Sequence, residues 1–249
     1  MNRLILVRQE NRVAVITLNR PEKKNALSIR LRSELMDVLA GLETDDSVYS
    51  VVLTGQGEQF SAGYDLSEFL DKSRWNELLK NSSAYHRKVF HFPKPLIAAI
   101  QGFAFAGALD LALLCDIRLC DSQARFGHPE IRFGAPPLFS LLKNVVGEGP
   151  ARHLCFSGNP IGAEEALRIG LVTEVVEASA LMQRALALAQ DIAASPLETL
   201  RYTKQCMAAA AGADFETAFA REHDQGLAAI PLELDRLPLR KTQAEHPKN

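Results

Sequence analysis

Hydrophobic residues in the first part of the chain follow two different periods. Residues 4–8 and 13–18 are short apolar runs separated by the turn-like Glu10-Asn11-Arg12, a pattern that predicts a β-hairpin. Leucine and valine then recur every three to four positions, which predicts an amphipathic helix ending near Leu42. Ser28 precedes this helix and is suited to be its N-cap.

The middle of the chain alternates strands and helices. Continuous apolar runs predict buried strands at residues 48–54, 96–100 and 117–120. Polar helical sequence occupies residues 68–87, and an almost wholly apolar helix is expected at 107–114. This alternation indicates an α/β core.

The second half of the chain is mostly helical. Helices are predicted over residues 137–146, 150–156, 163–169, 178–194, 196–211 and 215–229. One further short strand is expected at 172–176, and the tail beyond Ile230 is expected to be a docked extension that frays at its end. We therefore divide the chain into a core, residues 1–194, and a helical C-terminal region, residues 195–249.

A single acid, Asp110, lies inside the apolar helix expected at residues 107–114. Burial disfavours the charged form of a carboxyl group and raises its pKa. Small residues at the start of this helix, among them Gly107, would let a ligand approach the free amide N–H groups there. The combination indicates a candidate active site, and the alternative is that Asp110 only complements the helix dipole.

Composition narrows the classes of function. The net charge of -2 provides no basic surplus, so neither nucleic acid nor an anionic membrane is expected as a partner. The apolar run near the N-terminus is too short for a signal peptide, and no run approaches the ~20 residues of a membrane span. The four cysteines show no metal-ligand spacing, so no metal is expected and reduced thiols in the cytoplasm are favoured: Cys115, Cys120, Cys155 and Cys206.

Five motifs follow one another along the chain. They are NRPEKKNALS (residues 19–28), FSAGYDL (60–66), IQGFAFAGALDLALLCDIR (100–118), FGHPEIRFG (126–134) and ALRIGLVTEVV (166–176). In this order and spacing they resemble the crotonase family, also called the enoyl-CoA hydratase/isomerase superfamily. The resemblance covers nearly the whole chain. It implies an α/β fold, a crotonase-like spiral of repeated ββα units, followed by a helical C-terminal region.

The resemblance also implies a reaction. Crotonases bind acyl-CoA thioesters and stabilise an enolate at the thioester oxygen, and the family's two oxyanion-hole amides fall on the backbone N–H groups of Tyr64 and Gly107. The two catalytic acids fall on Asp110 and Glu130. Two carboxyl groups in opposite protonation states can take a proton from water and deliver one to the α-carbon. The implied activity is enoyl-CoA hydratase, with coenzyme A as part of the substrate and no separate cofactor.

The same resemblance places the nucleotide and pantetheine of CoA against the loops at residues 19–28 and 60–66. The residues implied to contact CoA are Lys24, Ala26, Ala62, Asp65 and Leu66. Lys24 and its neighbour Lys23 could meet phosphates as point charges, or be solvated surface residues without a ligand.

Two departures from the family pattern bear on the chemistry. Asp110 is one methylene shorter than the glutamate of the family hydratases, and Leu138 occupies a position where they carry glycine. Leu138 and Phe139 are expected to narrow the acyl pocket. Because Leu138 cannot be a base or nucleophile, chemistries in which the family uses an acid at that position are disfavoured.

Several alternatives stay open. Dienoyl-CoA isomerases share the Asp-then-Glu pair, so a double-bond isomerase is the second candidate, and a non-catalytic acyl-CoA binder is the third. Glu130 could instead be a surface acid at a helix start, and His128 could line the pocket or make a structural hydrogen bond. The resemblance further implies a homotrimer or a dimer of trimers, with the C-terminal helices contributing to the interface.

Overall fold

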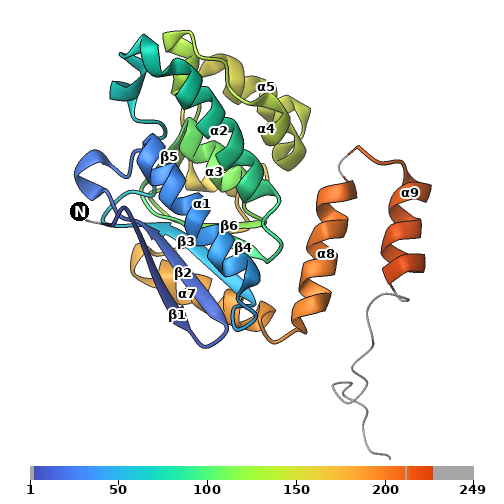
Figure 1. Cartoon of the computed structure of the whole chain (residues 1–249). Helices are drawn as coiled ribbons and strands as arrows, with labels where there is room; N and C mark the ends of the chain where they lie inside the picture. Colours follow the sequence, from blue (N-terminus) through green and yellow to red (C-terminus); the bar gives the residue numbers. More distant parts are fainter. Residues whose placement is uncertain (1–2, 211, 227–249) are drawn as a thin grey trace, which may run out of the picture.

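The computed structural model describes residues 3–210 and 212–226, and its centre is a six-stranded sheet (Figure 1). The strand order is β1-β2-β3-β4-β6-β9, with the bounds β1 (Ile5–Glu10), β2 (Val13–Leu18), β3 (Ser50–Gly55), β4 (Leu96–Ile100), β6 (Ile117–Asp121) and β9 (Glu174–Val176). β1 and β2 form the predicted antiparallel hairpin, and every other neighbouring pair in this sheet is parallel.

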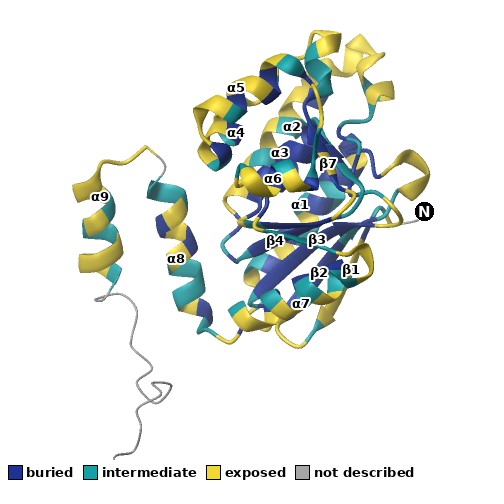
Figure 2. Ribbon diagram, turned by 180° about the vertical axis from the view of Figure 1, so that it is seen from behind, coloured by how far each residue is buried: buried dark blue, intermediate teal, exposed yellow. Residues whose placement is uncertain are grey.

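The inner strands β2, β3, β4 and β6 are largely buried because helices cover both faces of the sheet, whereas the edge strand β1 is mostly exposed (Figure 2). On β2, Ala14 and Ile16 pack into the main core, while the alternate residues Val13 and Val15 pack against α7 (Leu181–Ile192) on the opposite face. A sheet covered on both faces needs apolar residues at successive positions, which is why its strands are continuous apolar runs.

A small second sheet brings distant loops together. β5 (Phe103–Phe105) is parallel to β7 (Arg125–Gly127), and β8 (Ile161–Gly162) is antiparallel to β7. Single bridges between Ser61 and Ala104 and between Leu27 and Tyr64 extend this sheet. Each turn of the chain thus places a strand in the large sheet, a short extended piece in the small one, and then a helix. This repeat is the ββα spiral that the resemblance implies.

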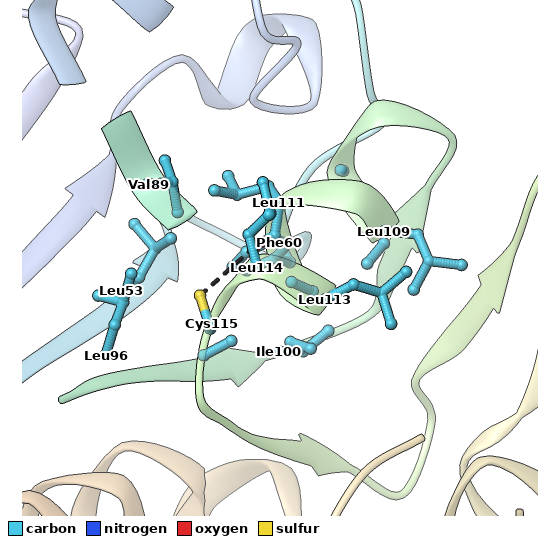
Figure 3. Close-up of a cluster of buried hydrophobic side chains, with 14 of the residues drawn as sticks. Leu53, Phe60, Val89, Leu96, Ile100, Leu109, Leu111, Leu113, Leu114 and Cys115 are labelled. Atoms are coloured by element: carbon cyan, nitrogen blue, oxygen red, sulfur yellow. Dashed lines mark hydrogen bonds between the residues drawn. The ribbon is translucent and has the colours of Figure 1, made fainter. Parts of the chain in front are cut away.

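Three helices follow the first three turns of the spiral: α1 (Ile29–Thr44), α2 (Trp75–Phe90) and α3 (Gly107–Leu114). Ser28 is the N-cap of α1, as predicted, because its side chain accepts a hydrogen bond of 3.2 Å from the amide of Leu31. α3 has its predicted bounds, and all eight of its residues are buried. Apolar side chains from strands and helices surround it (Figure 3).

Several predicted boundaries move by a few residues. The helical segment predicted at 68–87 starts as two 3₁₀ turns, Leu66–Phe69 and Lys72–Arg74, so α2 itself begins at Trp75. The strand predicted from residue 172 begins at Glu174, because the amides of Leu171 and Val172 turn back to the carbonyl of Ala166. The other elements of this half are α4 (Phe139–Val146), α5 (Glu148–Ser157), α6 (Ala163–Arg168) and a 3₁₀ turn, Ala178–Ala180, before α7.

The helical C-terminal region lies to one side of the sheet (Figure 1), and Lys204 within it donates hydrogen bonds to the carbonyl of Lys94 and the carboxylate of Asp116. It contains α8 (Leu197–Ala210) and α9 (Phe215–Phe219), and α9 continues as a π-helical turn, Ala220–Gln225. The remainder of the helix predicted to 229, and the tail predicted to dock beyond Ile230, lie outside the described residues. Among the helices that the structure describes, none is long and apolar enough to cross a membrane.

Candidate active site

The two amides expected to form an oxyanion hole lie beside each other in the structure. The loop that carries Gly63 and Tyr64 approaches the N-terminus of α3 so closely that a Cβ atom on Gly63 would lie 3.3 Å from the amide nitrogen of Gly107 and 2.6 Å from the carbonyl oxygen of Phe105. Gly63 also has a φ of +92°, which favours glycine. Within residues 3–210 and 212–226, the amides of Tyr64 and Gly107 have no hydrogen-bond acceptor. Both are therefore available to an oxyanion.

Ala106 orients the Gly107 amide. It has φ 53° and ψ −128°, a conformation that costs a non-glycine residue about 1–3 kcal/mol. Hydrogen bonds hold it in place, because its own amide donates to the carbonyl of Gly127 (2.9 Å) and its carbonyl accepts from Leu109 and Asp110 (2.8 and 3.1 Å). Since ψ of Ala106 sets the plane of the following peptide, this strained turn fixes the orientation of the Gly107 N–H.

Asp110 lies one turn into α3 and is 4% exposed. Burial is the main cause that raises its pKa to about 7, with a further contribution from Glu130 and an opposing one from His128. The upward direction agrees with the expectation from the sequence. Its Oδ1 atom has no hydrogen-bond partner among the described residues. A carboxyl group of this kind holds its proton near neutral pH and can donate it.

Glu130 lies near Asp110 and is linked to it through His128. Nδ1 of His128 is 2.8 Å from Oε1 of Glu130, and Nε2 of the same ring is 4.0 Å from Oδ1 of Asp110. His128 is fully buried, whereas the side chain of Glu130 is 19% exposed. The structural hydrogen bond considered for His128 thus exists, and its partner is the second acid of the pair. Glu130 itself belongs to a 3₁₀ turn, Pro129–Phe133.

The two loops implied to bind CoA lie against each other. The amide of Ala62 donates to the carbonyl of Lys24 at 3.0 Å, and Arg20 pairs with Asp65 at 2.6 Å. Lys24 and Leu66 are exposed, and Ala26 is buried. The structure therefore gathers all five residues implied to contact CoA at one place, although Asp65 already has a structural partner.

Phe139 is the first residue of α4, and Leu138 is the N-cap of this helix. Leu138 is exposed, and Phe139 packs partly against the main core with the guanidinium of Arg152 5.9 Å from its ring centre. Their assignment to the acyl pocket stays a prediction.

Arg32 was not predicted as a site residue and lies next to the ring of Tyr64. Its side chain is fully buried, with Cζ 4.6 Å from the ring centre of Tyr64 and Nη2 3.7 Å from Oε2 of Glu68. None of its three guanidinium nitrogens has a hydrogen-bond partner among the described residues. The sequence feature that could have identified it is a charged residue next to the leucines of the helix predicted to end near Leu42. A guanidinium cannot lose its proton, so Arg32 keeps a positive charge close to Tyr64.

We expect Arg32→Met to lower kcat of the reaction catalysed at this site by about tenfold, without loss of stability. Loss of a buried positive charge makes negative charge near the Tyr64 amide less favourable, while a methionine fills the same apolar space. Glu68 keeps its hydrogen bonds from the amide of Ile29. Steady-state kinetics with thermal unfolding tests this, and Arg30→Met, on the exposed side of the same helix, is the control. A change in unfolding temperature without a change in kcat would contradict it.

A cavity of about 500 Å³ lies on the α7 side of the sheet, and it is a weaker candidate for an active site than the region around Asp110. Thr54, Gln101, Asp121 and Met182 are among its lining residues. The Asp121 carboxylate is occupied by the amides of Gly102 and Gln123. In the described part of the chain, no group of three or more His, Cys, Asp or Glu side chains is arranged to hold a metal ion.

Comparisons with known proteins agree on one family. The sequence model described as enoyl-CoA hydratase/isomerase matches residues 8–229. A short-chain-enoyl-CoA hydratase of Clostridium acetobutylicum is 39% identical over 228 residues, 88% of this chain and 87% of that protein. A 2,3-dehydroadipyl-CoA hydratase of Escherichia coli is 35% identical over 89% of this chain and 88% of its own. The crystal structure of an enoyl-CoA hydratase from Bacillus anthracis superposes with a TM-score of 0.87 at 30% identity, covering 91% of this chain and 92% of that one.

Proposed function

The chain belongs to the enoyl-CoA hydratase/isomerase family, and from this premise we propose that it hydrates 2-enoyl-CoA thioesters with Asp110 and Glu130 as its acid–base pair. The observation that carries the proposal is a cluster of two acids and one histidine in which three side-chain atoms lack a hydrogen-bond partner among the described residues: Oδ1 of Asp110, Nε2 of His128 and Oε2 of Glu130. Buried polar atoms without partners call for a bound water or a reacting group.

The reaction needs two proton transfers in opposite directions. A carboxylate takes a proton from water as the water oxygen bonds to C3 of the enoyl group. Electrons of the C2–C3 double bond then shift toward the thioester oxygen, and C2 takes a proton from a carboxylic acid. Asp110, the drier of the two acids, is the proton donor, and Glu130 is the base. The amides of Tyr64 and Gly107 stabilise the oxygen that gains charge.

The presence of two acids favours hydration over the alternatives. Moving a double bond within the acyl chain needs a proton to leave one carbon and return to another, which a single carboxyl group can perform. Binding alone needs neither acid. Water, by contrast, must be held and split, and two acids that face the two nitrogens of one buried histidine ring are suited to that task.

CoA is proposed to lie along the loops at residues 19–28 and 60–66, with Lys24 near a phosphate. Lys24→Ala should then raise KM for crotonyl-CoA about two- to fivefold and leave kcat unchanged, because an exposed charge contributes little and acts only on binding. The difference should fade as salt is added. Lys143→Ala, which removes an exposed lysine paired with Glu148, is the matched control. An equal effect of both substitutions would refute the assignment.

Other properties follow from the same proposal. We propose a homotrimer or dimer of trimers built through residues 195–249, which is supported by exposed apolar side chains on α8 and α9: Met207, Phe215 and Phe219. The four cysteines are free and buried, which supports a cytoplasmic location. Since CoA enters with the substrate, the reaction needs no further cofactor.

Hydration of crotonyl-CoA, followed by the loss of enoyl-thioester absorbance, tests the proposed function. Turnover that is lost in Asp110→Asn and Glu130→Gln is the expected result. Tight binding of CoA esters without turnover at any chain length would indicate a binding protein instead.

A further inference from the structure

The side chain of Tyr64 packs against the start of α3. A Cβ atom on Gly107 would lie 2.6 Å from Cε2 and 2.7 Å from Cδ2 of the Tyr64 ring, so a side chain at residue 107 would displace the ring. Burial is the main cause that raises the pKa of the Tyr64 phenol, and the charge of Asp110 also raises it. The ring therefore lies close to the proposed oxyanion amide of Gly107 and within electrostatic reach of the proposed acid.

Three contacts hold the Tyr64 ring in this position. Its hydroxyl shares a hydrogen bond of 2.6 Å with the hydroxyl of Ser82 on α2. Cζ of the buried Arg32 lies 4.6 Å from the ring centre, and the ring of Phe69 meets that of Tyr64 in a T-shaped arrangement with the centres 6.1 Å apart. A cation over an aromatic face is attracted most strongly where water is excluded. An acyl chain cannot push the ring aside without breaking these contacts.

The proposed reaction places the acyl group beside this ring. The thioester oxygen must lie about 3 Å from the amide nitrogens of Tyr64 and Gly107 to accept hydrogen bonds from both. C2 of the same acyl group must reach Asp110, which lies one turn further along α3. The acyl chain therefore starts between α3 and the Tyr64 ring.

Next to the ring, side chains of α1 and α2 supply polar atoms. The three guanidinium nitrogens of Arg32, the hydroxyl of Tyr85 and Nε2 of His86 are buried and have no hydrogen-bond partner among the described residues. The ring centre of His86 lies 6.4 Å from that of Tyr64 and 4.8 Å from that of Tyr85. A long hydrocarbon chain placed here would keep these polar groups dry and without partners, which costs free energy.

On this basis, and given the proposed hydratase function, we infer that Tyr64 is a specificity-determining residue whose side chain restricts the substrate to short acyl chains, such as that of crotonyl-CoA. The backbone amide of Tyr64 serves the oxyanion, and its ring closes the acyl pocket. Long-chain 2-enoyl-CoA thioesters are disfavoured because the ring occupies their path and because the atoms next to it are polar.

The test compares the chain-length preference of two variants. The ratio of kcat/KM for 2-octenoyl-CoA to that for crotonyl-CoA is measured on one sample, so the fraction of folded enzyme cancels. Tyr64→Ala removes the ring and should raise this ratio by about 10- to 100-fold, the range in which the fit of a single methylene group alters selectivity. Tyr64→Phe keeps the ring and should keep the ratio close to that of the wild type.

Three results would overturn the inference. They are a wild type that hydrates both esters equally well, a ratio that is unchanged in Tyr64→Ala, and a ratio that rises equally in Tyr64→Phe.

Binding of saturated acyl-CoA esters tests the same residue without turnover. Butyryl-CoA should bind the wild type more tightly than octanoyl-CoA, and Tyr64→Ala should reverse this order in calorimetric titrations. The same order in both proteins would contradict the role of Tyr64. Failure of the hydratase proposal has a different signature, because the wild type would then bind these esters with the expected preference and turn over no enoyl-CoA.

Discussion

Replacing Asp110 by asparagine is expected to lower kcat for hydration of crotonyl-CoA by about 10²- to 10⁴-fold while raising the unfolding temperature near pH 8. The kinetic loss follows from removing the proposed proton donor. The gain in stability follows from the environment, because asparagine does not ionise in a place where a carboxylate does so at a cost. Kinetics and thermal unfolding of the same sample measure both effects.

The gain in stability from Asp110→Asn should depend on pH. The unfolded chain releases the Asp110 proton near 3.8, and the folded protein releases it near 7. Between these values the folded state binds more protons, so the contribution of Asp110 to stability falls as pH rises and stays lost above about pH 7. The difference in unfolding temperature between Asp110→Asn and the wild type should therefore grow from about pH 4 to pH 7.

Two comparisons make the result specific to the site. Glu130→Gln should lower kcat within the same range, because it removes the proposed base. Asp37→Asn, on the exposed side of α1, should change neither kcat nor the unfolding temperature measurably. A kcat for Asp110→Asn within threefold of the wild type would remove Asp110 from the mechanism.

The second large effect is expected from Gly63→Ala, with kcat lowered by about 10²- to 10³-fold. The added Cβ would lie 2.6 Å from the carbonyl oxygen of Phe105, and the backbone there has a φ of +92°. The loop must move away from α3, which separates the two amides proposed to stabilise the oxyanion, those of Tyr64 and Gly107. Steady-state kinetics and the unfolding temperature measure the loss of rate and of stability.

Gly41→Ala is the matched control for this substitution. A Cβ on Gly41 meets nothing within 4 Å, and the residue lies inside α1. Alanine there should leave kcat unchanged and stabilise the protein by about 0.5–1 kcal/mol. If Gly63→Ala retained full activity, the oxyanion hole would have to lie elsewhere.

The sequence predicts those parts of the fold that local pattern determines. α3 was predicted with its observed bounds because a run that is apolar except for Asp110 begins at a small-residue turn and ends before Asp116. The N-cap Ser28 and the hairpin of β1 and β2 depend on neighbouring residues only. The small sheet was missed because β5 and β7 have three residues each, too few to show a period.

Some features of the candidate site could likewise be predicted from the sequence, and others could not. The upward shift of the Asp110 pKa follows from one acid in an apolar helix, so it could be inferred from the sequence. The contact of His128 with both acids could not, because it depends on how α3 and the turn after β7 meet in space. Arg32 was missed for a related reason, since only the folded chain places it over the ring of Tyr64.

Hydration in water enriched in oxygen-18 tests the central claim most directly. The product formed from crotonyl-CoA should carry one labelled oxygen at C3, and formation of this product should be lost in Asp110→Asn and Glu130→Gln. Double-bond migration in a 3-enoyl-CoA without uptake of label, and without hydration of crotonyl-CoA, would contradict the account.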